Sequence, residues 1–129
     1  MHDKKTITGL IKGFYPYAKE KMGFNKPCRV FLHEDETNAA NALGKSAFYD
    51  PGKMEVHLYI TGRHPKDILR SMCHELIHHT QNCRGEFDGV MEAGAGYAQK
   101  NEHLRMMEKE AYQGCIVLRD WEDSLKENK

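Results

Sequence analysis

The feature that most constrains the fold of this 129-residue chain is an amphipathic segment that begins at Pro65 and runs to about Asn82. Proline suits the first position of a helix, and a glycine-containing stretch follows the segment, as is typical of a helix end. Apolar residues recur at helical spacing and form one stripe, made of Ile68, Leu69, Met72, Cys73, Leu76 and Ile77. At about 100° per residue, this stripe points about 170° away from the midpoint of His74 and His78. The segment therefore predicts a helix with one face in a core and two imidazoles on the opposite face.

His74-Glu75-Leu76-Ile77-His78 is an H-E-x-x-H motif within this predicted helix. Residues four apart on a helix share a face, so both histidines can bind one zinc ion at about 2.0–2.1 Å. Glu75 is displaced around the helix, where it can take a proton from a metal-activated water as general base. The alternative is a chance match in a chain with eight histidines, which the helical context disfavours. The motif predicts one Zn²⁺ ion with His74 and His78 as ligands.

A third protein ligand is expected because catalytic zinc usually takes three, with water in the fourth position. We predict a last helix that starts near Ala98 and continues past Gly114 to about Leu125, with a buried stripe of Leu104, Met107, Ala111, Cys115 and Leu118. Glu108 lies about 50–60° from the centre of this stripe, whereas Glu110 points about 110–120° away on the other side. A carboxylate near a core costs several kcal/mol unless it is paired or binds a metal. Glu108 is therefore the predicted third ligand; the open alternatives are Glu110, Glu92 or His103 as ligand, and a salt bridge from Glu108 to Arg105 or Lys109.

The rest of the chain predicts a small sheet and a further helix. Residues 6–22 have the apolar spacing of an amphipathic helix, and residues 28–33 are typical of a strand. Residues 46–49 and 54–60 flank the turn sequence Asp50-Pro51-Gly52-Lys53, which predicts a hairpin. Residues 37–45 are ambiguous. We expect a single domain over residues 1–129 of class α+β, with a small, mainly antiparallel sheet.

Composition excludes several classes of function. Lys plus Arg and Asp plus Glu each number 19, so the net charge is zero, which argues against binding to nucleic acid or to a membrane surface. No apolar run approaches the roughly 18 residues of a membrane span, and the N-terminal residues do not resemble a signal peptide. The four cysteines show no C-x-x-C spacing, which argues against a zinc ribbon or a thioredoxin-type redox motif. Because no signal peptide is recognised, we expect reduced thiols in a cytoplasmic protein.

The motif and its helix resemble the zincin metallopeptidases, and a glutamate ligand on a following helix resembles their gluzincin branch. In several gluzincin families the third ligand opens an E-x-x-A-[DN] segment, and Glu108-Lys109-Glu110-Ala111-Tyr112 follows this pattern up to the alanine. Tyr112 departs from it at a position where an acidic or amide residue commonly supports a metal-bound histidine. The hairpin followed by His-Glu-Leu-Ile-His-His-Thr-Gln is similar to small peptidase-like proteins of phages and bacteria. The resemblance covers roughly residues 46 to 115 of this chain.

The resemblance implies a zincin-like fold and a zinc-dependent peptidase that acts on peptide or protein substrates in the cytoplasm, or in the host cytoplasm if a phage encodes it. It also implies that the strand at residues 54–60 borders the cleft as the edge of the sheet, although an internal position is equally compatible with the sequence. Gluzincins commonly stabilise the oxyanion with tyrosine or histidine, and the candidates are Tyr97, His103 and Tyr112. His57 and His79 are expected to have ordinary surface or packing roles. The rival hypotheses are a zinc-binding domain without turnover, in a structural, regulatory or protein-binding role, and a domain that retains the fold with an empty site.

Overall fold

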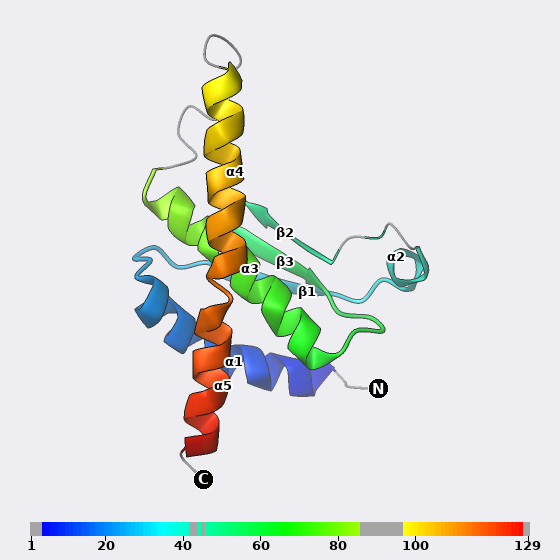
Figure 1. Ribbon diagram of the computed structural model, residues 1–129. Helices are drawn as coiled ribbons and strands as arrows, with labels where there is room; N and C mark the ends of the chain where they lie inside the picture. Colours follow the sequence, from blue (N-terminus) through cyan, green and yellow to red (C-terminus); the bar gives the residue numbers. More distant parts are fainter. Residues whose placement is uncertain (1–3, 42–43, 45, 86–96, 128–129) are drawn as a thin grey trace.

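The computed structural model describes residues 4–41, 44, 46–85 and 97–127, with side chains except at residues 97–101 and 103. Five helices and three strands lie in these ranges (Figure 1). In chain order they are α1 (Lys4–Met22), β1 (Arg29–His33), α2 (Glu36–Ala40), β2 (Ala47–Asp50), β3 (Glu55–Tyr59), α3 (Pro65–Cys83), α4 (Tyr97–Gln113) and α5 (Ile116–Glu127). The expected α+β class is confirmed. None of the helices in this part of the chain is long and apolar enough to cross a membrane.

The sheet has the strand order β1-β3-β2. β2 and β3 form the predicted antiparallel hairpin, with Phe48 opposite His57. β1 pairs with the other edge of β3 and runs parallel to it, so the sheet is mixed where a mainly antiparallel one was expected. The reason is topological, because β3 inserts between β2 and β1. β3 is thus the central strand, and β2 is an edge.

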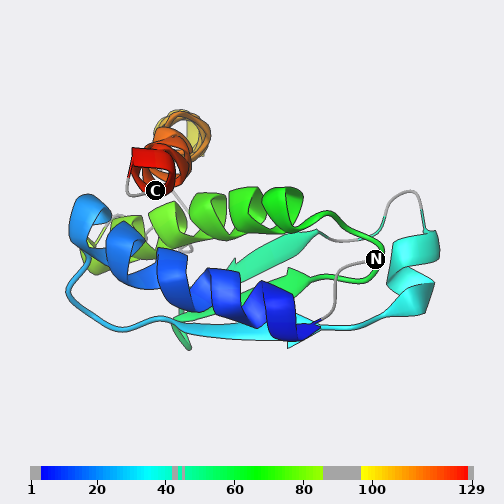
Figure 2. The same ribbon diagram turned by 90° about the horizontal axis from the view of Figure 1, so that it is seen from below.

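α3 lies on one side of the sheet with α4 and α5 beyond it, whereas α2 lies past one end of the strands (Figure 2). α3 covers β2 and β3 and contacts α1, while α4 contacts α3, and α5 contacts both α1 and α3. The core between the sheet and these helices includes the fully buried side chains of Phe14, Val56, Leu58, Met72 and Leu76. Burial of a side chain of this size contributes about 1.5–3 kcal/mol, so this interface carries much of the stability of the domain.

The expectation of one continuous C-terminal helix is wrong. α4 and α5 follow each other along nearly one line but are separated at Gly114 and Cys115 (Figure 1). The chain comes so close to α3 here that a Cβ atom at Gly114 would lie 1.8 Å from Ile77 Cδ1. Met107, Ala111 and Leu118 are buried as predicted, whereas Leu104 is exposed and Cys115 is only partly buried. Trp121 completes the buried stripe.

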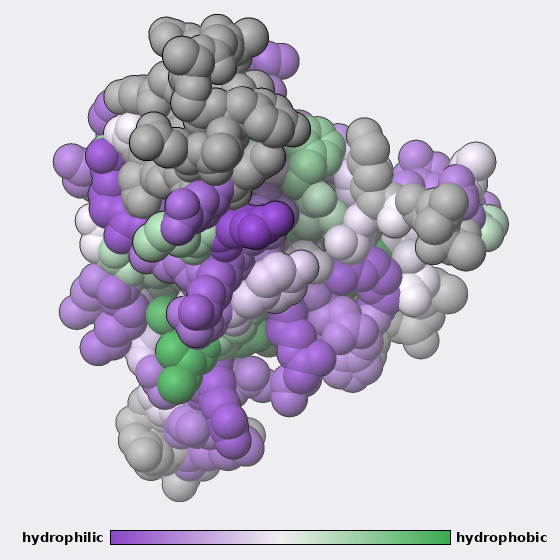
Figure 3. All heavy atoms as spheres, turned by 45° about the horizontal axis from the view of Figure 1, so that its top comes forward, coloured by the Kyte–Doolittle hydropathy of each residue, from purple (hydrophilic) through white to green (hydrophobic). Residues whose placement is uncertain are grey.

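The outer face of the sheet carries a row of aromatic rings across all three strands. His57 stacks between Phe31 and Phe48, at centroid distances of 5.0 and 4.5 Å. Its ring nitrogens contact His33 and Glu55, so His57 belongs to this face and not to the helix-covered side. The face shown in Figure 3 is mainly hydrophilic where its residues are described, with hydrophobic residues in small groups.

Candidate metal centre

The two histidines of the motif lie on α3, on the side opposite the core. The predicted helix is confirmed over Pro65–Cys83, and His64 caps its start by accepting a hydrogen bond from the Lys66 amide. All six residues of the apolar stripe are buried. Because that stripe fixes the rotation of the helix, His74 and His78 both turn toward α4, with their ring centroids 4.9 Å apart.

Glu108 of α4 reaches both imidazoles. Its Oε1 lies 2.8 Å from His78 Nε2, and its Oε2 lies 3.4 Å from His74 Nε2. The donor atoms of the three side chains all lie within 4.8 Å of one another. Ligands at about 2.0–2.1 Å on a tetrahedral zinc ion lie roughly 3.4 Å apart, so this spacing fits one such ion after small side-chain shifts. The structure thus brings together the three residues that the sequence predicts as ligands.

The position of Glu108 was predicted on a physical ground that does not hold. Its side chain is 52% exposed, so burial does not force the carboxylate to find a partner. The geometry comes instead from its place on α4, one position after the buried Met107. Proximity to the two histidines, and not escape from the core, is what distinguishes Glu108.

Glu110 points to a different set of partners. Its Oε1 accepts hydrogen bonds from Arg84 Nη2 at 2.6 Å and from Gln81 Nε2 at 2.7 Å. Burial raises the pKa of Glu110, but these hydrogen bonds outweigh that effect and the net shift is downward. A carboxylate held in this way joins α4 to the end of α3 and is turned away from the candidate metal position.

Gln81 is the residue of the site that sequence reasoning missed. Its amide nitrogen donates to the Met107 carbonyl and to Glu110, so its Oε1 is left to accept from His78 Nδ1 at 2.8 Å. With its proton on Nδ1, neutral His78 presents the Nε2 lone pair to a cation bound between this nitrogen and Glu108. The sequence spacing of Gln81 could have predicted this contact, because a polar residue three positions after His78 lies on the same helical face.

Glu75 lies beside the two histidines and lines two adjoining cavities. Burial raises the pKa of its carboxyl to about 6; the charge of His78 opposes this shift and that of Glu108 adds to it. Burial also lowers the pKa of His74, and the neighbouring His78 lowers it further. Both shifts suit the chemistry, because a base works best with a pKa near the working pH and a metal binds the neutral imidazole.

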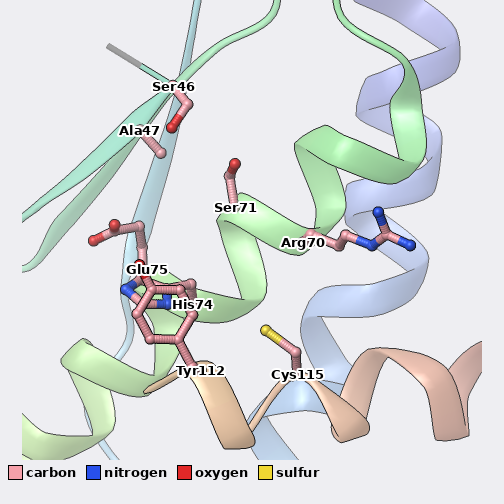
Figure 4. Close-up of a pocket in the computed structure, with 8 residues that line it drawn as sticks. All are labelled: Ser46, Ala47, Arg70, Ser71, His74, Glu75, Tyr112 and Cys115. Atoms are coloured by element: carbon pink, nitrogen blue, oxygen red, sulfur yellow. The ribbon is translucent and has the colours of Figure 1, made fainter. Parts of the chain in front are cut away.

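The remaining candidates divide into those the structure describes and those it does not. Tyr112 packs edge-on against the ring of His74, with centroids 4.7 Å apart, and stays 70% exposed at the mouth of a cavity (Figure 4). Glu92 and the side chains of Tyr97 and His103 lie outside the described residues. His79 is fully buried and bridges Tyr49 and the Lys26 carbonyl, each at 2.7 Å, which confirms its packing role.

The cleft at the site runs between β2 and α3. A cavity of about 330 Å³ is lined by residues of β2, the following turn, and the candidate ligands. A second cavity of about 460 Å³ shares Ala47, His74 and Glu75 with the first and extends toward the start of α3. The edge strand beside the site is therefore β2, and the strand at residues 54–60 is internal.

Comparison with models of protein families, with curated protein sequences and with solved structures gave no match.

Proposed function

We propose that the protein is a zinc-dependent peptidase in which His74, His78 and Glu108 hold the ion. The observation that carries this proposal is the convergence of the three donor groups from two helices, with Glu75 beside them in an open cleft. Nitrogen and carboxylate donors in this combination are typical of catalytic zinc, which keeps one position for water. Such an ion would act as a Lewis acid that polarises a peptide carbonyl and makes water more acidic.

Glu75 performs the proton transfers in this mechanism. Its carboxylate accepts the proton of the attacking water and then delivers a proton to the leaving amine as the peptide C–N bond breaks. A pKa raised to about 6 by burial suits both steps near neutral pH. Gln81 keeps His78 in the tautomer that presents Nε2 to the ion.

β2 is suited to bind an extended substrate backbone. It is an edge strand, and its residues Ala47, Phe48 and Tyr49 line the cavity that contains the candidate ligands. Main-chain pairing with an edge strand provides affinity without a strict sequence requirement, and pockets then supply specificity. The substrate class that follows is a peptide or an unfolded segment of a protein.

The test is hydrolysis of fluorescently labelled casein by zinc-loaded protein and by Glu75→Gln. We expect the variant to retain one zinc ion and to lose turnover by at least about 100-fold, because it lacks the base. Glu20→Gln, an exposed change on α1, serves as the matched control and should leave both quantities unchanged. Equal turnover in the parent and Glu75→Gln would refute the mechanism.

The rival hypothesis of a zinc-binding domain without turnover makes a different prediction in the same assay. It expects zinc binding in the parent and in Glu75→Gln, with hydrolysis in neither. Metal analysis of protein purified without added zinc, with His74→Ala as control, separates both hypotheses from a domain with an empty site.

A further inference from the structure

The cavity beyond Glu75 is the strongest remaining clue to what the site takes. It continues the cleft past the shared residues Ala47, His74 and Glu75 toward the first turns of α3. Ser71 and Cys115 line its middle, and Arg70 lies at its far side with its guanidinium directed away from Glu75 and His74, so this side chain would have to turn to meet a group in the cavity (Figure 4). A group bound here would adjoin the bond that is cleaved, because Glu75 lines both cavities.

Positive charge gathers at the far end of this cavity. Arg70 lies one helical turn before His74, and its partner Asp67 is 3.3 Å away with both side chains more than half exposed. Exposed pairs of this kind contribute only about 0–1 kcal/mol, so Arg70 can exchange this partner for another anion at little cost. The field of Arg70 acts on the cavity: the pKa of Cys115 is lowered to about 7, first by a hydrogen bond with Cys73 and also by this arginine.

Arg63 adds a second guanidinium behind the cavity wall. It donates to the carbonyl oxygens of Ser46, Tyr59 and Asp67 and to Ser71 Oγ, all of which are neutral groups. Because Ser71 Oγ accepts from Arg63 at 2.8 Å, its own proton is left to donate toward the cavity. The far end thus combines two cations, one nearby carboxylate and a hydroxyl donor, whereas the near end carries the carboxylate of Glu75.

We infer that this cavity is a subsite for a carboxylate of the substrate, adjacent to the scissile bond and recognised by Arg70 and Ser71. The inference rests on the proposed metal centre and names the substrate class that the centre acts on. A carboxylate at this position comes either from an acidic side chain or from the C-terminus of the peptide. A cation with a hydroxyl donor favours an anion over an amide of the same shape, since charge-assisted hydrogen bonds are about twice as strong as neutral ones.

The experiment uses malonyl hydroxamates, in which one hydroxamate binds zinc and the attached residue enters a neighbouring subsite. The attached residues are aspartamide, its neutral isostere asparaginamide, alanine with a free carboxylate, and alaninamide. Binding to zinc-loaded protein is measured by calorimetry for the parent, for Arg70→Gln and for Arg119→Gln, an exposed change on α5. We expect at least one acidic probe to bind the parent three- to tenfold tighter than its neutral counterpart, with this preference lost in Arg70→Gln and retained in Arg119→Gln.

The four probes identify the source of the carboxylate, and they also show whether a negative result refutes the subsite or the metal centre. A preference for aspartamide assigns the subsite to an acidic side chain, and a preference for free alanine assigns it to a C-terminus. If all four probes bind the parent equally, the subsite is refuted while the metal centre stands. If none of them binds zinc-loaded protein, the metal centre is refuted and the subsite with it.

Discussion

Gln81→Leu should weaken zinc binding although Gln81 does not contact the metal position. In the parent, Gln81 Oε1 accepts from His78 Nδ1 at 2.8 Å and thereby fixes the tautomer and orientation of the ring. Loss of a partner of this kind typically costs 10–100-fold in metal affinity. This range corresponds to about 1.4–2.8 kcal/mol. We therefore expect the dissociation constant for zinc to rise by that factor.

The same change should destabilise the metal-free fold. Gln81 is fully buried and makes hydrogen bonds to His78, to the Met107 carbonyl and to Glu110. Leucine removes this partner of His78 Nδ1, which costs about 1–3 kcal/mol, and one partner of the Met107 carbonyl, which keeps its hydrogen bond within α4 and loses less. Glu110 keeps its bond to Arg84 and loses less. The free energy of unfolding should fall by about 2–4 kcal/mol.

Gln81→Glu separates the two effects. Glutamate still accepts from His78, so zinc affinity should stay within about threefold of the parent. It loses the donor to Met107 and places a second carboxylate near Glu110, so the metal-free protein should be destabilised. Zinc affinity is measured by competition with a chromophoric chelator, and stability by urea unfolding in EDTA, with Gln113→Leu on the exposed side of α4 as control. A folded Gln81→Leu protein that binds zinc as tightly as the parent would refute this account of His78.

Three further predictions concern stability. Gly114→Ala should lower the free energy of unfolding by about 1–3 kcal/mol, because its Cβ would meet the buried Ile77. Gly9→Ala should raise the free energy of unfolding by about 0.5–1 kcal/mol, because a Cβ there has nothing within 4 Å. Urea titrations of both variants check this pair. Burial lowers the pKa of His79 below its usual 6.5, so on acidification the unfolded chain protonates this histidine before the folded chain does, and stability falls as the pH drops from 7.5 to 5.5. Metal-free His79→Gln should lose less stability than the parent over this interval. Equal losses would contradict the assignment of this pH dependence to His79. Zinc at 100 times its dissociation constant should stabilise the parent by about 2.7 kcal/mol in thermal or urea unfolding, and an equal gain in His74→Ala would place the ion elsewhere.

The local part of the fold could be read from the sequence. α3 was predictable because its apolar spacing, its proline start and its glycine-containing end all agree, and the rotation of the two histidines follows from the stripe alone. The β2–β3 hairpin was predictable from turn residues between two apolar segments. Both depend on contacts between residues that are close in the chain.

The parts that failed depend on contacts between distant segments. Nothing in the local pattern around Gly114 shows that Ile77, far away in the chain, occupies the space of a side chain there. The parallel pairing of β1 with β3 also depends on a distant contact, because β1 pairs with the edge of β3 that β2 does not occupy. Gln81 stayed unnoticed because its role needs Met107 and Glu110 from another helix.

The way α4 is attached to α3 determines how the candidate metal centre should respond to a bound ion. Met107 and Ala111 are buried against the core on either side of Glu108, and the Gln81–Glu110–Arg84 hydrogen bonds connect the two helices independently of any cation. The core between the sheet, α1 and α3 also forms without a contribution from the three candidate ligands. An ion that binds to these ligands would therefore meet a site that is already assembled, in contrast to small zinc domains that unfold without metal. Removal of zinc should accordingly lower the midpoint of unfolding, while the far-ultraviolet circular dichroism of the metal-free protein stays that of a folded α+β chain. An unfolded spectrum in EDTA would show instead that the ion itself joins α4 to α3.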